Sequence, residues 1–367
     1  MRFEIIVIIF SLVEALTHFG NANPIRGDPS LGFDSPFYVK MLLYLAGDYP
    51  EPPPQPFRMR PIIPAAAIPL YKIIGINNAF GLVNTVLWVA TALVMYSLAF
   101  SLTGDARMGL VSSLAFSSTV PILVYGAAIS TDMVGYLVLV SSIFIAVSRR
   151  PSIRTGAVLG PLLGVGILAR ELVVIAIPTI LAIRLSKKES KTETIKELVV
   201  LTLIAPIPPL AWQLIIPDPG YTAYFAENLR NAFTMERLLK SLTNIILTYH
   251  IGWIFIAIGF FTRHPYRNLL ISCSIPIVLF LIVDYFIGVL TSRFVVLTFP
   301  TFLIWLAVGI DKASNIVNEK LGLLQKEQVL LIILALYIAA SNIGTAEYNI
   351  ALPSLSDEPI KKLFPTQ

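Results

Sequence analysis

Residues 269–283 read LLISCSIPIVLFLIV, and this apolar run decides the fold class of the chain. Similar runs are IIVIIFSLVEAL at residues 5–16, ELVVIAIPTILAI at 171–183 and VLLIILALYIAA at 329–340. Their apolar residues follow one another continuously instead of alternating at every second position. This pattern is typical of membrane-crossing helices and not of barrel strands. We therefore predict an all-α polytopic membrane protein.

The composition of the 367-residue chain excludes an ordinary soluble domain. Hydrophobic residues make up 56% and charged residues 13%, whereas about a quarter of the residues of a soluble domain are charged. The formal net charge of +5 does not indicate nucleic-acid binding, because basic loops fix the orientation of membrane proteins. Cys273 is the only cysteine, so the chain can form no internal disulfide and no cysteine-based metal site.

The apolar runs predict a single multi-span domain over residues 1–346, external loops at 20–78 and 217–244, and an external tail at 347–367. We expect about eleven spans, near residues 3–19, 79–103, 107–124, 131–148, 155–169, 171–185, 197–216, 245–262, 268–290, 293–310 and 328–345. For the first span a cleaved signal peptide is the alternative, but Asn21-Ala22-Asn23 is a poor cleavage site. Residues 62–74 are apolar but too short to span and contain two prolines, so we predict a re-entrant or interfacial helix there.

Basic residues set the expected orientation, because cytoplasmic turns of membrane proteins are rich in lysine and arginine. With the N-terminus in the cytoplasm, every inner turn is basic: Arg107; Arg149, Arg150 and Arg154; Arg184, Lys187, Lys188, Lys191 and Lys196; Arg263 and Arg267; Lys312, Lys320 and Lys326. Arg170 and Arg293 lie instead in short outer turns, so each should have a specific partner or function. We expect a multi-pass protein of the plasma membrane, or of the endoplasmic reticulum in a eukaryote.

Charge is concentrated in the first external loop. Residues 21–64 read NANPIRGDPSLGFDSPFYVKMLLYLAGDYPEPPPQPFRMRPIIP and carry Arg26, Asp28, Asp34, Lys40, Asp48, Glu51, Arg58 and Arg60. The same topology brings further ionisable residues to this side: Asp132, Arg170, Glu171 and Arg293. Acids and arginines that converge at a membrane surface suit a substrate with a lipid tail and an anionic head.

Several of these residues have a purely structural alternative. Asp34 precedes Ser35-Pro36 and an apolar-periodic run, so it can cap a helix as well as act on substrate. Thr131-Asp132 also reads as a helix cap. The arginines at 58 and 60 can anchor the loop to lipid headgroups, and the one at 293 can reach the interface by snorkelling. Residues 170 and 171 are adjacent and do not face each other along a helix, so each should pair elsewhere.

Five segments, in order, carry a resemblance to a known superfamily: GFDSPFYVKML with RMRPIIPAAAIPLYKIIG, AISTDMVGYLVLVSSIFIA, GVGILARELVVIAIPTILA and TSRFVVLTFPTFLIWLAVGI. Together they resemble the C-type glycosyltransferases, with most likeness to the protein O-mannosyltransferase and aminoarabinose transferase branch. The resemblance implies that Asp34, with the aromatic Tyr38 four residues later, is the catalytic base. The branch often has a second acid directly after the first, where this chain has Ser35, and this departure leaves the acceptor open.

The resemblance implies transfer of a hexose-type sugar from a polyprenyl monophosphate, such as a dolichyl phosphate, to an acceptor lipid, glycan or protein at the non-cytoplasmic face. In that scheme Asp34 takes the proton of the acceptor hydroxyl, and the arginines at 58, 60 and 293 hold the leaving phosphate. The substrate-binding candidates are Asp28, Tyr38, Arg58, Arg60, Asp132, Arg170, Glu171 and Arg293. Direct displacement implies inversion and requires no metal in principle, although the acids at 28 and 34 can together hold a divalent ion.

Two other classes compete with this reading. A transporter or flippase of lipid-linked sugars needs polar residues at mid-membrane depth and broken helices in matching halves. In this chain the charges gather at one surface and no internal repeat is visible. A structural membrane subunit is the third class, and it would not respond to neutralisation of Asp34.

Overall fold

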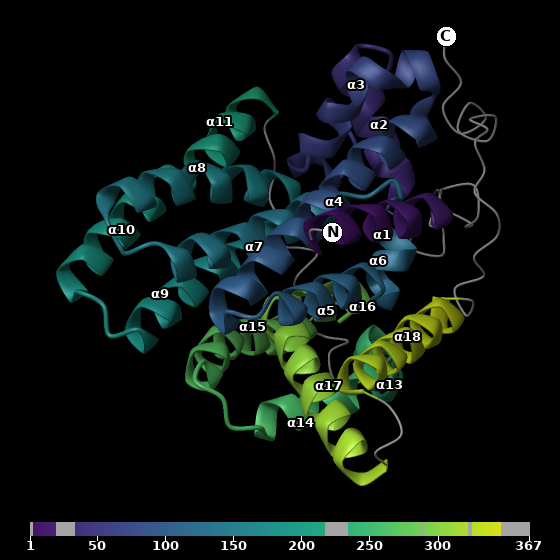
Figure 1. The fold of residues 1–367 in the computed structure, drawn as a ribbon. Coiled ribbons are helices and arrows are strands. Elements are labelled where there is room, and N and C mark those ends of the chain that lie inside the picture. Colours follow the sequence, from purple (N-terminus) through teal and green to yellow (C-terminus); the bar gives the residue numbers. More distant parts are fainter. Residues whose placement is uncertain (1–2, 20–33, 217–233, 288–289, 322–324, 346–367) are drawn as a thin grey trace.

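The computed structural model describes residues 3–19, 34–216, 234–287, 290–321 and 325–345, and its regular secondary structure over these residues is entirely helical (Figure 1). The prediction of an all-α polytopic fold is therefore confirmed. Residues 20–33, 217–233 and 346–367 lie outside the described part of the chain. They contain Asp28, most of the second predicted external loop and the predicted tail, so the division into domain, loops and tail stays a prediction.

In the first third of the chain, α1 (Phe3–Thr17), α3 (Ile62–Ile74) and α5 (Ala106–Ser117) pack against one long helix, α4 (Ile76–Thr103). This part also contains α2 (Ser35–Ala46) and α6 (Val120–Tyr125), with a short 3-10 turn η2 (Phe57–Met59). The predicted interfacial helix 62–74 is present as α3 with the same bounds. The long helix α4 ends at Gly104, whose φ of 69° is a left-handed conformation that glycine adopts readily.

The middle of the chain continues with α7 (Asp132–Ser148), α8 (Ile153–Ala169), the 3-10 helix η3 (Glu171–Ile175), α9 (Ala176–Ser186), α10 (Lys191–Ile204) and α11 (Ile207–Ile215). The last part contains α13 (Met235–Tyr249), α14 (Gly252–Phe261), α15 (Arg267–Ile287), α16 (Ser292–Val295), the 3-10 helix η4 (Val296–Thr298), α17 (Phe299–Leu321) and α18 (Lys326–Thr345). α13 and α14 are bent by 79° at a break around His250, which has a positive φ of 35°.

The predicted spans coincide with helices, but the count of eleven is not confirmed. Within the described residues five helices are long and apolar enough to cross a bilayer, or six if the bent pair α13–α14 is one span. Two predicted spans are broken instead of continuous: 107–124 divides into α5 and α6, and 171–185 into η3 and α9. Pro121 in the first turn of α6 accounts for the first break, and at the second the chain passes from a 3-10 to an α-helical conformation at Ala176.

The helices pack around a central layer formed by α4, α5 and α7. In Figure 1 the teal helices α8–α11 lie on one side of this layer, and the green and yellow helices α14, α15 and α17 lie on the other. α14 and α17 cross at two glycines: a Cβ at Gly259 would meet the Trp305 carbonyl, and one at Gly309 would meet the Phe255 carbonyl. This close approach fixes α14, whose neighbouring residues form a wall of the groove described below.

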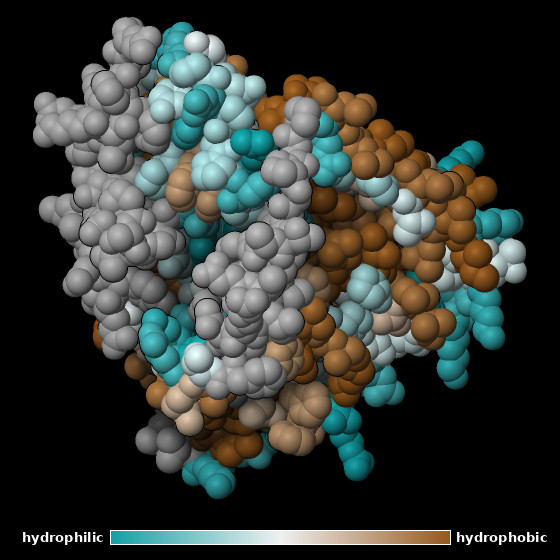
Figure 2. Space-filling view, turned by 180° about the vertical axis from the view of Figure 1, so that it is seen from behind, coloured by the Kyte–Doolittle hydropathy of each residue, from teal (hydrophilic) through white to brown (hydrophobic). Residues whose placement is uncertain are grey.

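The surface agrees with a membrane environment. Figure 2 shows a broad apolar band, drawn in brown, between hydrophilic patches at opposite ends of the molecule. At the end formed by the α9–α10 turn, Arg184 and Glu197 make a fully buried bidentate ion pair with N–O distances of 2.7 and 2.8 Å. Arg184 also donates to the carbonyls of Ala146 and Arg149, so this arginine joins α7, α9 and α10.

Candidate active site

Asp34 lies directly before α2, at the position expected for a helix cap. Its side chain accepts no hydrogen bond from the helix backbone, so the capping alternative is wrong. The Asp34 Oδ2 atom accepts instead from Nη1 of Arg293 at 3.0 Å. The Asp34 side chain is 20% exposed and that of Arg293 14%. The carboxylate is thus held by a cation and still accessible.

Arg293 connects Asp34 to a second acid. The same Nη1 atom lies 3.5 Å from Oδ2 of Asp132, and Nη2 of Arg170 lies 2.6 Å from Asp132 Oδ1. Asp132 and Arg170 are buried, with 1% and 4% of their surface exposed. The cap expected from Thr131 makes no hydrogen bond to the helix. We call Asp34, Asp132, Arg170 and Arg293 the charged network.

The four residues of the network come from four chain segments, and each lies at the end of a helix or in a very short one. Asp132 is the first residue of α7, Arg170 separates α8 from η3, and Arg293 lies in the one-turn helix α16. Tyr136, one turn further along α7, donates to the Arg293 carbonyl at 2.8 Å. Two aromatic rings support the guanidinium groups: Tyr125 lies 5.0 Å from Arg293 and Phe294 lies 5.2 Å from Arg170. These contacts restrict both arginines to one arrangement.

Arg60 and Glu171 form an ion pair beside the network. Glu171 accepts from Nε and Nη2 of Arg60 at 3.0–3.2 Å, a fork geometry that fixes the guanidinium plane. Nη1 of Arg60 donates to the hydroxyl of Tyr38 at 3.0 Å, and Thr131 donates to the same hydroxyl at 3.2 Å. The expectation that residues 170 and 171 pair elsewhere is confirmed. Tyr38 is fully buried, so in this structure it holds Arg60 in place.

The described contacts of Arg58 lie outside the network. Arg58 donates from Nε to the Pro53 carbonyl at 3.3 Å, and its own carbonyl accepts from the Trp212 indole at 2.9 Å. These described contacts tie Arg58 to its own loop and to α11. Asp28 lies outside the described residues, so its place in the site stays a prediction.

The ionisation state of Asp34 follows from the balance of two effects. Burial raises the pKa of this carboxyl, whereas the positive charges of Arg293, Arg170 and Arg60 lower it. The arginines outweigh burial, so the pKa of Asp34 lies below its ordinary value. Asp34 is therefore a carboxylate at neutral pH, which is the state that a general base requires.

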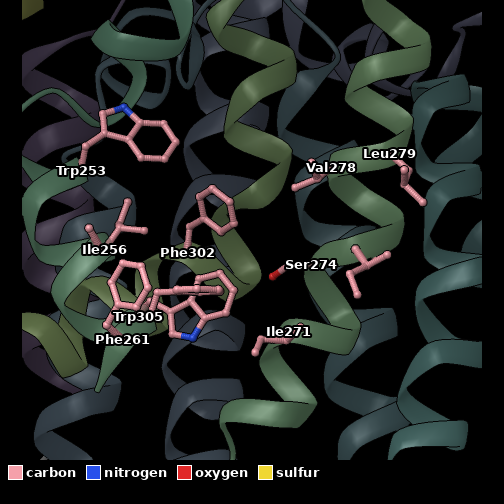
Figure 3. Close-up of a pocket in the computed structure, with 12 residues that line it drawn as sticks. Trp253, Ile256, Phe261, Ile271, Ser274, Val278, Leu279, Phe302 and Trp305 are labelled. Carbon is pink, nitrogen blue, oxygen red and sulfur yellow. The ribbon is translucent and has the colours of Figure 1, made fainter. Parts of the chain in front are cut away.

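An apolar groove begins beside the network. It consists of two adjoining cavities of about 510 and 450 Å³ between α13, α14, α15 and α17. Trp253, Val278 and Phe302 line both cavities, and Figure 3 shows the Trp253 and Phe302 rings on one side and Val278 across the gap. The second cavity reaches Leu290 and Val295, on either side of Arg293.

The groove has the length and chemistry of a lipid site. Its lining runs along α15 from Ile271 to Phe286, which is about 22 Å at 1.5 Å per residue. The hydrocarbon core of a bilayer is about 30 Å thick, so the groove follows most of one membrane crossing. Trp253 contributes its ring to this lining. No sequence signal predicts the groove, since its shape depends on how these helices pack against one another.

A family model described as dolichyl-phosphate-mannose-protein mannosyltransferase matches residues 60–212. Among solved structures, ArnT from Cupriavidus metallidurans bound to undecaprenyl phosphate superposes with a TM-score of 0.61 at 14% identity, covering 98% of this chain and 77% of that one. The chain has the C-type glycosyltransferase fold. The resemblance predicted from the sequence is thereby confirmed.

An archaeal enzyme shares this C-type fold. Oligosaccharyltransferase AglB from Archaeoglobus fulgidus, in complex with an inhibitory peptide and a dolichol-phosphate, gives a TM-score of 0.58 at 11% identity. The comparison covers 94% of this chain and 56% of AglB, so the present chain spans little more than half the length of that enzyme. A search of curated proteins found no match. Identities this low show the fold alone, and the activity has to be argued from the site.

Proposed function

We propose that this protein is a membrane glycosyltransferase that moves a sugar from a polyprenyl-monophosphate-linked donor to an acceptor hydroxyl, with inversion at the anomeric carbon. One observation carries the proposal: an ionised, accessible carboxylate is ion-paired to a partly buried arginine, and the residues on either side of this arginine in the chain line the end of a long apolar groove. A prenyl tail needs such a groove, and its phosphate needs such an arginine.

Donor binding follows from the adjoining groove and network. The tail would lie along α15, and the phosphate would lie at the groove end next to Arg293, where the network supplies positive charge. ArnT and AglB, whose fold the chain shares, are described as bound to undecaprenyl phosphate and to a dolichol-phosphate. These ligands support the class of donor but not the identity of its sugar.

The proposed reaction is a single displacement. The acceptor oxygen forms a bond to the anomeric carbon, the bond between that carbon and the phosphate oxygen breaks, and the electron pair leaves with the phosphate. Asp34 takes the proton of the acceptor hydroxyl, which contributes about 10²- to 10⁴-fold to the rate. Because the attacking and leaving oxygens lie on opposite sides of the carbon, the configuration is inverted.

The arginines stabilise the charge that develops on the leaving phosphate. Arg293 has a planar group with several N–H donors, of which the network uses Nη1, and this leaves other donors for phosphate oxygens. Arg60, held in one plane by Glu171, is the second candidate, and Arg58 is the third. No metal is required in this proposal, since guanidinium groups supply the charge. A divalent ion between Asp28 and Asp34 is the alternative and would compete with Arg293 for the Asp34 carboxylate.

The proposal also covers the acceptor, the side of the membrane and the cellular location. The acceptor is a lipid, a glycan or a protein, and nucleic acid is not a partner. We place the network at the non-cytoplasmic face, because the basic turns mark the opposite side as cytoplasmic. The location is the plasma membrane, or the endoplasmic reticulum in a eukaryotic source.

A transfer assay tests the proposed function. Membranes containing the protein are incubated with sugar-labelled polyprenyl phosphates of several hexoses, and the label is followed between lipid, acceptor and free-sugar fractions. A transferase moves label from the lipid to the acceptor fraction. Label that stays on the lipid but changes sides of the membrane would establish the flippase instead, and release of free sugar alone would establish a hydrolase.

A further inference from the structure

Asp284 is a carboxylate buried in a membrane helix. It lies on α15, directly after the apolar run 269–283, and only 8% of it is exposed. Its Oδ2 atom is buried and has no hydrogen-bond partner among the described residues. An ionisable side chain inside a span is expensive and rare, and it usually marks a substrate pathway or a buried pair. Residue 284 lies within the predicted span 268–290, and an acid directly after such an apolar run is the sequence signal for a functional residue there.

Two arginines lie within electrostatic range of the Asp284 carboxylate. One is Arg170 of the charged network, and α15 packs against η3, which begins directly after this residue. The other is Arg237 on α13, which is 6% exposed and donates from Nη2 to the carbonyl of Tyr285. Asp284 is thus within electrostatic range of one arginine of the network and of a second arginine, Arg237, whose neighbour Leu238 lines the groove.

α15 presents different chemistry on two faces. Val278, Ile282 and Tyr285 line the groove, whereas Asp284 lies about 100° further round the helix than Tyr285. A lipid that follows the groove and places its phosphate at Arg293 therefore passes along the same helix that carries Asp284. The sugar is bonded directly to that phosphate, so it must lie within one sugar width of the arginines.

The charge of Asp284 decides what it can bind there. A carboxylate repels a phosphate, so Asp284 does not contact the phosphate itself. It accepts hydrogen bonds, and its two oxygens match two neighbouring hydroxyl groups of a pyranose. We propose that Asp284 binds hydroxyl groups of the sugar carried by the donor lipid and so contributes to sugar selection. This inference rests on the proposed function and extends it to the sugar subsite.

Lipid binding tests the assignment without requiring turnover. The full-length protein in nanodiscs is titrated with polyprenyl phosphate and with a panel of hexosyl polyprenyl phosphates that begins with the mannosyl lipid. The variants are Asp284→Asn and Asp284→Leu. Asp311→Asn is the matched control, because Asp311 pairs with Lys326 at 2.7 Å at the other end of the bundle. The thermal midpoint of each variant shows whether it has folded, and the amide variant preserves the side-chain volume if the leucine variant does not fold.

We expect the Asp284 variants to bind their preferred hexosyl lipid about ten- to a hundredfold more weakly, because a charge-assisted hydrogen bond is lost. Binding of bare polyprenyl phosphate should stay within about threefold of wild type, as should all affinities of Asp311→Asn. Equal weakening for bare and glycosylated lipid would overturn the sugar assignment and indicate a structural role. Unchanged affinity for the hexosyl lipids would also overturn it. Asp284 would then be a candidate to bind a hydroxyl group of the acceptor instead of the donor sugar.

The outcome is separable from that of the proposed function. A wild-type protein that binds a hexosyl lipid more tightly than the bare lipid, but moves no label, would refute the transferase and leave the Asp284 assignment to be decided by the variants. A wild type that binds no member of the panel more tightly than the bare lipid would refute the sugar subsite, whatever the transfer assay shows.

Discussion

Replacing Arg293 with glutamine should change both the rate and its dependence on pH. Arg293 contributes most among the three arginines that lower the pKa of Asp34, and it touches this carboxylate at 3.0 Å. An opposite charge at about 4–6 Å shifts a carboxyl pKa by about 1–3 units. Because Arg170 and Arg60 remain in Arg293→Gln, we expect the pKa of Asp34 to rise by about one to two units.

The sign of the effect on activity follows from the role of the base. Asp34 acts only as a carboxylate, so activity is lost as the pH falls through its pKa. In the wild type this loss should occur below the ordinary carboxyl range, and in Arg293→Gln it should move upward by the same one to two units, as estimated above. The variant should also lose about 10²- to 10³-fold in kcat, because one donor to the developing phosphate charge is removed.

The assay is a profile of kcat/KM for transfer from a labelled polyprenyl-phosphate sugar, measured between about pH 2.5 and pH 8 so that the wild-type acid limb is included. Arg293→Lys is the control, because it keeps the positive charge and should keep the acid limb near its wild-type position. An acid limb that is the same in Arg293→Gln and wild type would show that Arg293 does not set the ionisation of the base. The ion pair between Asp34 and Arg293 would then not contribute to the function of the base.

Three further changes test separate parts of the account. Glu171→Gln removes the charged half of the fork that orients Arg60, and we expect kcat/KM to fall about tenfold, as measured in the same transfer assay; an unchanged rate would remove Arg60 from the site. Val278→Trp fills the shared wall of the groove, so a lipid titration should show about tenfold weaker binding of bare and glycosylated polyprenyl phosphate alike; unchanged binding would place the tail elsewhere. Glu197→Ala leaves the fully buried Arg184 without its main partner and should cost about 3–5 kcal/mol in thermal unfolding without moving the acid limb; an unaltered melting temperature would show that this pair does not join the helices.

The helices could be predicted from the sequence because local patterns define them. Apolar runs separated by glycine, proline and basic turns give the positions of the spans, and residues 62–74 differ from them because they are fewer and contain two prolines. The number of complete spans was not predictable in this way. The predicted span 107–124 is one apolar run in the sequence, whereas the structure interrupts it at Ser118 and Thr119, between α5 and α6.

The meeting of the turns that carry Asp132, Arg170 and Arg293 was also predictable, since the topology places these turns at the same end of the helices. The pairing inside the site was not. Asp34 and Arg293 are 259 residues apart, and nothing local shows that they touch. For the same reason a helix cap and a network member could not be distinguished at Asp132 from its neighbours alone. Asp284 lies in the predicted span 268–290, and nothing in the apolar run before it shows which side chains it faces in the fold.

The central claim is that Asp34 is the base of a transfer reaction, and the most direct measurement is turnover of Asp34→Asn beside Asp48→Asn. Asp48 is the matched control, because it is an acid at the C-terminal end of α2 that pairs with Tyr71 and Lys72 outside the network. The account predicts that Asp34→Asn loses about 10²- to 10⁴-fold in kcat while binding the donor lipid like wild type, and that Asp48→Asn keeps its activity. Transfer by Asp34→Asn at a rate within about threefold of wild type would contradict the account.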